Sequence, residues 1–218
     1  MSRFSLFLFP LVPVALACSS PTTTPSPADT QDAGASADQV APVVVTDAGN
    51  AYPEGPYGNA VDKVLADEEF AGYFRTETTG LASEATYGPL KFSELRNKAT
   101  VKYALIHYSA YWCGLCKATV TEMVAAYAEN ASKTLFIDVL VEGATPSDTS
   151  TKTQLDSWAK NLKVPYTVLQ DPDGVKFEAK TKLGERRTIM LVELQTMKVL
   201  YRGTDDFAGA IAKLKKLE

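Results

Sequence analysis

Residues 101–117 read VKYALIHYSAYWCGLCK, an apolar run followed at once by two cysteines that are two residues apart. Residues 101–109 are mostly β-branched, aromatic or aliphatic, which is typical of a strand buried on both faces. Apolar side chains then recur at helical spacing through residues 116–130. The stretch therefore predicts a strand that leads directly into a helix, with Cys113 and Cys116 at the junction.

Similar patterns follow towards the C-terminus. A lead-in hairpin region is expected at 61–73, ending near Gly80, further strands at 135–141, 188–194 and 197–202, and further helices around 155–162, at 175–183 and at 205–218. The last two strands face each other across a tight turn at Gln195-Thr196. This order of elements predicts an α/β domain built around a mixed sheet.

The composition describes an ordinary globular protein. Of 218 residues, 45% are hydrophobic and 22% charged, and the net charge is −4. A chain of this length can bury a core without metal or disulfide staples. The acidic balance argues against nucleic acid as a partner, because binders of nucleic acid normally carry a basic excess.

The N-terminus predicts export. Arg3 precedes an apolar run to Ala17 that is too short to span a bilayer, so residues 1–17 are expected to be a signal peptide. The run ends in VALAC and resembles the bacterial lipobox, which implies lipidation of Cys18. A plain signal peptide with a chance cysteine is the alternative. Residues 18–56, rich in Pro, Ser, Thr and Ala, are expected to form a disordered tether before a domain at 57–218.

The segment ALIHYSAYWCGLCK, residues 104–117, resembles the active-site segment of thioredoxins. Over residues 60–218 the chain resembles the extracytoplasmic TlpA/redoxin-type thiol-disulfide oxidoreductases better than short thioredoxins, because the strand and helix after LFIDVLV look like the insertion of that branch. The resemblance implies a thioredoxin-like fold. Its central mixed β-sheet is flanked by helices, and it carries an inserted strand–helix and an N-terminal hairpin extension.

The spacing of the cysteines suits redox chemistry. Two residues between cysteines on the first turn of a helix bring the sulfurs within disulfide reach, and the helix N-terminus favours the thiolate of the first. Cys113 is the expected nucleophile and Cys116 the resolving thiol, with Trp112 and Lys117 as active-site neighbours. Half of a zinc site is the main alternative, but three cysteines and one histidine in the whole chain cannot complete it.

Three positions depart from the thioredoxin pattern, and one of them is Leu115, which replaces the usual proline between the cysteines. The family carries a cis-proline beside the cysteines, for which Pro165 is one candidate. The redoxin-type alignment instead places Arg187 there, directly before Thr188, and predicts a trans peptide bond. His107 stands six residues before Cys113, where thioredoxins have a buried acid. It is either a proton shuttle or a hydrogen-bonded strand histidine.

The resemblance and the N-terminus together predict a membrane-tethered thiol-disulfide oxidoreductase that faces the periplasm. Ser19 after the lipidated cysteine favours the outer membrane. Neither a cofactor nor a metal is expected, and the expected partners are protein disulfides or dithiols and a redox partner. A redox-inactive binding lipoprotein with a structural CxxC disulfide is the main alternative. Copper handling by Cys113, Cys116 and His107 is a weaker one, and the direction of electron flow stays open.

Overall fold

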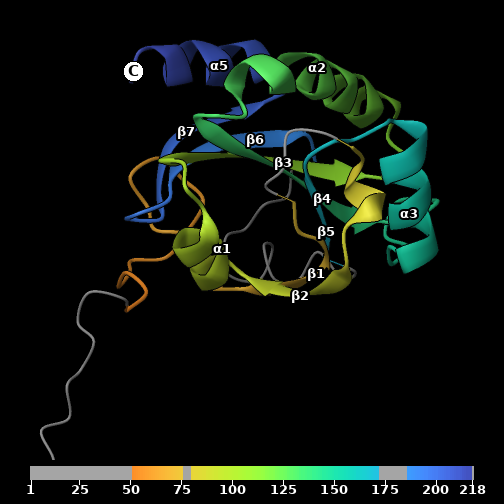
Figure 1. Cartoon of the computed structure of the whole chain (residues 1–218), viewed down its shortest axis with the longest axis horizontal. Coiled ribbons are helices and arrows are strands. Elements are labelled where there is room, and N and C mark those ends of the chain that lie inside the picture. Colours follow the sequence, from red (N-terminus) through yellow and green to blue (C-terminus); the bar gives the residue numbers. More distant parts are fainter. Residues whose placement is uncertain (1–50, 76–79, 172–185, 218) are drawn as a thin grey trace, which may run out of the picture. The chain divides into compact units, whose positions relative to one another are not determined.

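A central sheet organises the computed structural model, which describes residues 51–75, 80–171 and 186–217 (Figure 1). Within these ranges the sheet has seven strands in the order β2-β1-β5-β4-β3-β6-β7. The strands are β1 (Glu69–Tyr73), β2 (Tyr87–Lys91), β3 (Tyr103–Ala110), β4 (Thr134–Glu142), β5 (Thr167–Gln170), β6 (Thr188–Glu193) and β7 (Lys198–Thr204). β3, β4 and β5 run parallel and every other pair is antiparallel. The predicted α/β class and mixed sheet are confirmed.

Several expected features lie outside the described residues. These are the signal peptide at 1–17, the lipidation site Cys18, most of the tether at 18–56 and the whole of the helix expected at 175–183. In the part of the chain that is described, no helix is both long enough and apolar enough to cross a membrane.

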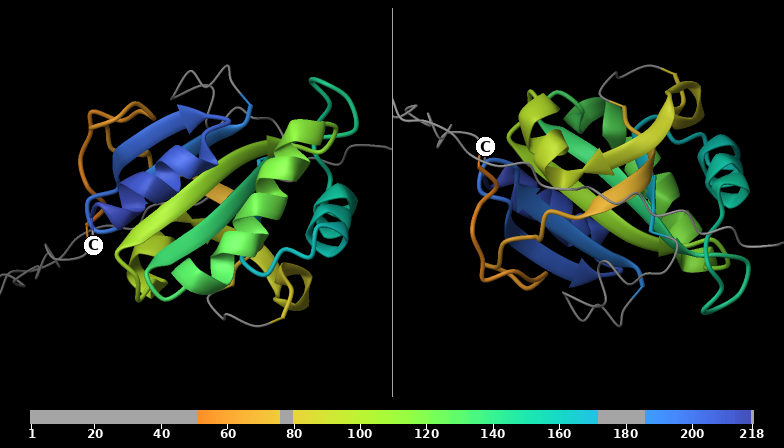
Figure 2. Two further views of the ribbon diagram at one scale, coloured as in Figure 1. Left: turned by 90° about the horizontal axis from the view of Figure 1, so that it is seen from above. Right: turned by 90° about the horizontal axis from the view of Figure 1, so that it is seen from below.

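Helices cover both faces of the sheet (Figure 2). On one face lie α2 (Gly114–Asn130), α3 (Lys152–Asn161) and α5 (Phe207–Lys215), whose buried side chains share a hydrophobic cluster with Leu105, Phe136 and Ile189. On the other face α1 (Phe92–Lys98) packs through Phe92 and Leu95 on the alternate residues of β3 and β4. Side chains that alternate along a strand thus serve two cores, which explains the nearly continuous apolar runs.

The helix α1 was not expected from the sequence, the inserted strand was expected without a residue range, and the hairpin is displaced. The helix α1 and the strand β5 are both short, with seven and four residues, and give little periodic signal. The N-terminal hairpin consists of β1 and β2, which pair with Gly72 opposite Gly88, and not of residues 61–73. A long connection that includes the 3₁₀ turn η1 (Ala82–Glu84) separates its strands, so no tight-turn signal marks it.

Residues 51 and 52 contact the folded unit through hydrogen bonds to Arg96 and Leu65. The Tyr52 hydroxyl donates to the carbonyl of Leu65 at 2.8 Å. Arg96 on α1 donates to the carbonyl of Ala51 at 2.8 Å and to that of Gln195 at 3.0 Å. Gln195 follows the end of β6, which is paired with the beginning of β3. Residue 51 therefore lies at the end of the sheet where β3 starts.

Candidate functional site

The disulfide-bonded cysteines lie at the junction between β3 and α2. Cys113 is the N-cap residue of α2, and its Sγ accepts a hydrogen bond from the Cys116 amide at 3.1 Å. Cys113 and Cys116 form a disulfide with their Cα atoms 5.3 Å apart. The first turn of α2 contains no acidic residue. In the reduced state the amide and the helix dipole are therefore placed to stabilise a thiolate at Cys113.

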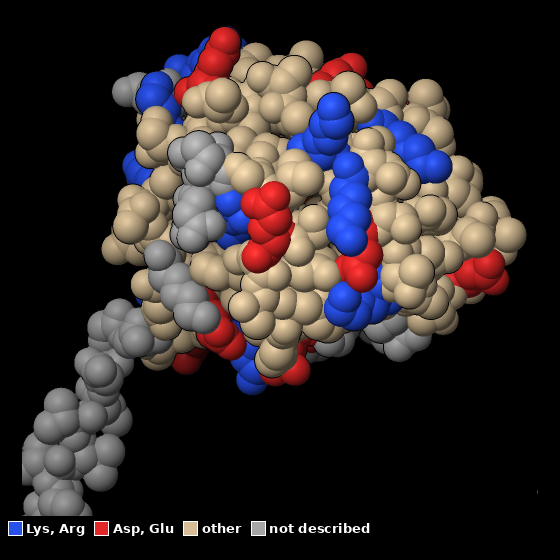
Figure 3. Space-filling view, turned by 45° about the vertical axis from the view of Figure 1, so that its right-hand side comes forward, with Lys and Arg blue, Asp and Glu red and all other residues tan. Residues whose placement is uncertain are grey.

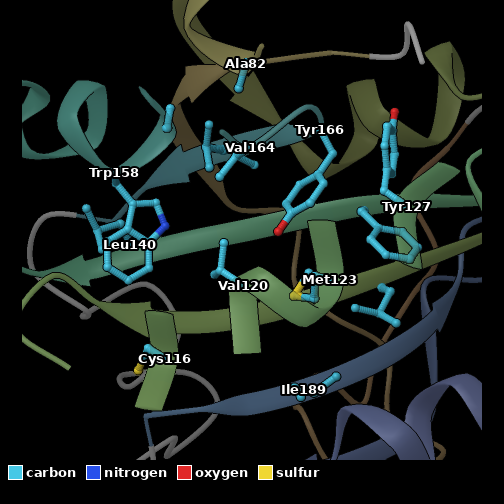
Figure 4. Close-up of a cluster of buried hydrophobic side chains, with 14 of the residues drawn as sticks. Ala82, Cys116, Val120, Met123, Tyr127, Leu140, Trp158, Val164, Tyr166 and Ile189 are labelled. Carbon is cyan, nitrogen blue, oxygen red and sulfur yellow. The ribbon is translucent and has the colours of Figure 1, made fainter. Parts of the chain in front are cut away.

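The two sulfurs differ in access. Cys113 is 6% exposed, whereas Cys116 is fully buried. Figure 4 shows Cys116 at one edge of the hydrophobic cluster, on the same helix as Val120 and Met123. Cys113 lines a groove at the surface and Cys116 does not, so an incoming thiol or disulfide would approach Cys113 first. This is the asymmetry that a nucleophile and a resolving thiol require.

Glu142, Trp112 and Arg186 form a polar cluster next to Cys113, which we call the Glu142 clamp. The Trp112 indole N–H donates to Glu142 Oε2 at 2.7 Å. The Arg186 guanidinium donates Nε to the same oxygen at 2.6 Å and Nη2 to Oε1, and it lies 5.6 Å from the centre of the Trp112 ring. A Ser147 amide adds a bond of 3.2 Å to Oε1. The carboxylate at the end of β4 thus fixes the ring that precedes the cysteines.

The pKa of Glu142 is lower than its ordinary value. Burial by itself would raise this pKa, but the hydrogen bonds from Arg186, Trp112 and the Ser147 amide favour the charged form and outweigh it. Glu142 is therefore ionised at neutral pH, and the clamp holds one full negative charge between an indole and a guanidinium.

Arg187, and not Pro165, lies beside the disulfide. β6 is antiparallel to β3, so the residue before β6 lies at the end of β3 that carries the cysteines. The Arg187 amide donates to the carbonyl of Tyr108 at 2.7 Å. Pro165 precedes β5, which runs parallel to β4 and β3, and this places it at the opposite end of the sheet. The peptide bonds that precede both residues are trans.

The backbone at Arg187 is left-handed, with φ of 72°. This conformation is uncommon for a residue other than glycine. It is held by the amide bond to Tyr108, by the Arg187 carbonyl accepting from the Asp205 amide at 3.1 Å, and by an ion pair between the two side chains. The following Thr188 begins β6 and is fully buried, opposite Thr204 of β7.

A groove opens over the more accessible sulfur. It has a volume of about 530 Å³, and its described lining residues are Trp112, Cys113, Gly114, Leu115, Arg186, Arg187 and Thr204. Leu115 of the CGLC motif is exposed. Lys117, the other expected neighbour, holds its ammonium 5.3 Å from the centre of the Tyr111 ring.

His107 is fully buried in the sheet and hydrogen-bonded. Its Nδ1 lies 2.8 Å from Oδ1 of Asp138, the residue opposite it on β4, and the Trp158 indole N–H donates to the other oxygen of Asp138. Sequence reasoning did not find Asp138. The signal was available, because His107 and Asp138 are each the polar interruption of an apolar run, and such positions can face each other in adjacent strands.

The described residues give no support to the copper alternative. Nowhere in these ranges do three His, Cys, Asp or Glu side chains come together so that they could hold a metal ion. Cys113, Cys116 and His107 all belong to the described residues, so they are not a ready three-ligand site.

Comparison with proteins of known structure identifies the fold. No protein-family model and no curated protein matches the chain. Solved structures do match. A protein from Bacteroides thetaiotaomicron assigned as a protein disulfide isomerase is 16% identical over 76% of this chain and 91% of its own, with a TM-score of 0.53. The exposed lipoprotein thioredoxin Etrx1 of Streptococcus pneumoniae is 18% identical over 69% and 99%, with a TM-score of 0.50.

A third structure comes from Chlorobium tepidum and is assigned as the thiol:disulfide interchange protein DsbE. It is 20% identical over 71% of this chain and 99% of its own, with a TM-score of 0.50. At these identities the likeness concerns the fold. The chain has the thioredoxin-like fold, as its sequence predicted, with the disulfide at its strand–helix junction.

Proposed function

We propose that this protein is a membrane-tethered thiol-disulfide oxidoreductase of the bacterial envelope, acting through Cys113 and Cys116. The observation that carries the proposal is the disulfide at the N-terminus of α2, with Cys113 lining the surface groove and Cys116 fully buried in the core. A purely structural disulfide needs neither this difference in access nor a groove over the accessible sulfur.

The exchange takes two steps when the protein acts as a reductant. The Cys113 thiolate attacks one sulfur of a substrate disulfide, a mixed disulfide forms, and the other substrate sulfur leaves as a thiolate. The Cys116 thiolate then attacks Cys113 Sγ, which releases the second substrate thiol and forms the Cys113–Cys116 disulfide. Two electrons pass to the substrate, and a redox partner must return them. With an oxidising partner, the same steps run in reverse.

Trp112, Lys117, Arg187 and Thr188 are proposed as active-site neighbours, and His107 as a buried group behind the site. Trp112 and Arg187 support this role by lining the groove over Cys113. No step of the exchange needs a cofactor or a metal.

The proposed location is the periplasmic side of the envelope, with a lipid anchor at Cys18 and outer-membrane sorting. The lipobox-like end of the signal peptide supports it, and so does the likeness in fold to an exposed lipoprotein thioredoxin. The expected partners are protein disulfides or dithiols.

Trapping tests the proposed function. In the Cys116→Ser variant the resolving thiol is absent, so mixed disulfides with Cys113 should accumulate in envelope extracts and disappear in the Cys113→Ser/Cys116→Ser control. The wild-type chain should also reduce insulin. If no mixed disulfide forms and insulin stays oxidised, the chain is a redox-inactive binding protein with a structural disulfide.

The reduction potential of the Cys113–Cys116 couple then decides the direction of electron flow. A value near about −270 mV, as in thioredoxin, would indicate a reductase, and one near about −120 mV an oxidant.

A further inference from the structure

We infer that the groove over Cys113 selects substrates that carry a carboxylate beside their disulfide, that is, acidic peptide segments. This inference rests on the proposed function and names its substrate class. It starts from two consecutive arginines, Arg186 and Arg187, which both line the groove.

Consecutive residues of an extended chain normally point to opposite sides. Arg186 and Arg187 do not follow this alternation, because Arg187 has a left-handed backbone with φ of 72°. The turn brings both guanidinium groups to the same groove, next to Trp112 and Cys113. A conformation that is uncommon for a bulky residue is thus maintained where it adds a second guanidinium group to the site.

Each arginine is oriented by a carboxylate from outside the groove lining. Glu142 binds Arg186, and Asp205 binds Arg187. The two arginine side chains remain 34% and 30% exposed. Among the described residues that line the groove, the arginines are the charged ones. The exposed part of each paired guanidinium faces the groove, and guanidinium binds carboxylates in a fork geometry.

The attraction is local and does not come from the charge of the whole protein. The net charge of the chain is −4, which by itself disfavours an acidic partner. On the face seen in Figure 3, basic and acidic side chains are interspersed. An acidic substrate can gain only from charges within the groove, and such selection fades as salt screens them.

The groove also has room for a substrate chain. A Cβ added to Gly114, between the cysteines, would meet no atom within 4 Å. Packing within the described part of the chain therefore does not require glycine at this position. The open space lies directly beside the sulfur that a substrate disulfide must approach.

Matched peptides test the inference. Three peptides that differ only in Glu, Gln or Lys beside one cysteine are activated as 2-pyridyl disulfides. The reduced full-length chain attacks the peptide sulfur, and release of 2-thiopyridone gives the rate. Each rate is divided by that of 2-mercaptoethanol with the same peptide. We expect the Glu peptide to react about fivefold faster than the Gln peptide, with the Lys peptide slowest, and the preference to vanish in 1 M NaCl.

Variants assign the preference to the groove. Arg187→Gln should lose most of the preference for the Glu peptide, and Arg187→Lys should keep part of this preference. Lys216→Gln, which removes an exposed charge on the far end of α5, should keep all of it. Equal normalised rates for the three peptides would overturn the inference while leaving the proposed function intact.

If no peptide reacts, the proposed function fails and a binding measurement decides the preference. Peptides with serine in place of cysteine are then titrated against the oxidised chain, with tryptophan fluorescence, to which Trp112 and Trp158 contribute, as the signal. Tighter binding of the Glu peptide supports an acidic preference, and equal binding overturns it.

Discussion

Replacing Glu142 by glutamine removes the negative charge of the Glu142 clamp and keeps its size. A glutamine oxygen in the place of Oε2 can still accept from the Trp112 indole and from Arg186 Nε, but the amide nitrogen in the place of Oε1 then faces two donors, Arg186 Nη2 and the Ser147 amide. The Glu142 side chain is 12% exposed, so this charge interaction is only partly screened. Arg186 is more exposed and regains water when its partner is lost. Hydrogen bonds to charged groups contribute about 1.5–3 kcal/mol each, and we expect a net loss of about 1–2 kcal/mol at pH 7.

The loss should depend on pH in a defined direction. The folded-state pKa of Glu142 lies below its ordinary value of 4.5, so the stabilisation is complete above that value and disappears as the pH falls through the lowered pKa. At the acid end the wild-type side chain is neutral like glutamine. The difference between Glu142→Gln and wild type should therefore shrink as the pH falls below 5, because the wild type loses the contribution of this charge and the variant has none to lose.

Urea unfolding followed by tryptophan fluorescence measures the difference across this range. Glu122→Gln, an exposed position on α2, is the matched control and should stay within about 0.5 kcal/mol of wild type. At neutral pH the melting temperature of Glu142→Gln should fall by about 3–6 °C. A loss below 0.3 kcal/mol at pH 7, or one that stays the same down to pH 2, would refute the assignment of a charged clamp.

Two further predictions concern the scaffold. In Gly72→Ala the new Cβ would lie 2.2 Å from a backbone carbonyl of β5, so the variant should lose the β1–β5 pairing and more than about 3 kcal/mol of stability. Gly88 lies opposite Gly72 on β2, and a Cβ added there meets open space. Gly88→Ala should therefore cost under about 1 kcal/mol in the same urea assay. Asp138→Ala leaves His107 and the Trp158 indole without their shared buried partner, and it should cost about 3–5 kcal/mol. A Gly72→Ala protein as stable as Gly88→Ala, or an Asp138→Ala protein within 1 kcal/mol of wild type, would contradict these contacts.

The long apolar runs made most of the fold predictable. β3, β4 and β6 are buried on both faces, so their composition alone marks them, and Asp206 with the late lysines marks α5. β5 could not be found in this way, because a strand of four residues next to Pro165 gives no period to detect. The hairpin of β1 and β2 depends on a pairing between distant residues, which no local pattern reports.

The site residues also divide into those that a local sequence pattern predicts and those that only the tertiary structure brings together. Cys113, Cys116 and Trp112 are adjacent in sequence, and their motif was sufficient to locate them. Glu142 and Arg186 meet Trp112 only through the sheet, from the end of β4 and the start of β6. Their role is visible only when the strand order is known. The choice between Pro165 and Arg187 needed strand direction, which the sequence did not supply.

The point at which the chain enters the folded unit has a consequence for how the protein meets its partners. Arg96 holds residue 51 at the end of the sheet where β3 begins, and the disulfide lies at the other end of that strand. The eight residues of β3 span about 26 Å, so the two points are opposite poles of the unit. Under the proposed anchoring at Cys18, the tether enters the domain at the end opposite the disulfide. Substrate proteins that diffuse in the periplasm can then approach Cys113 directly. A partner embedded in the same membrane can approach Cys113 only after the domain rotates so that the disulfide faces the membrane.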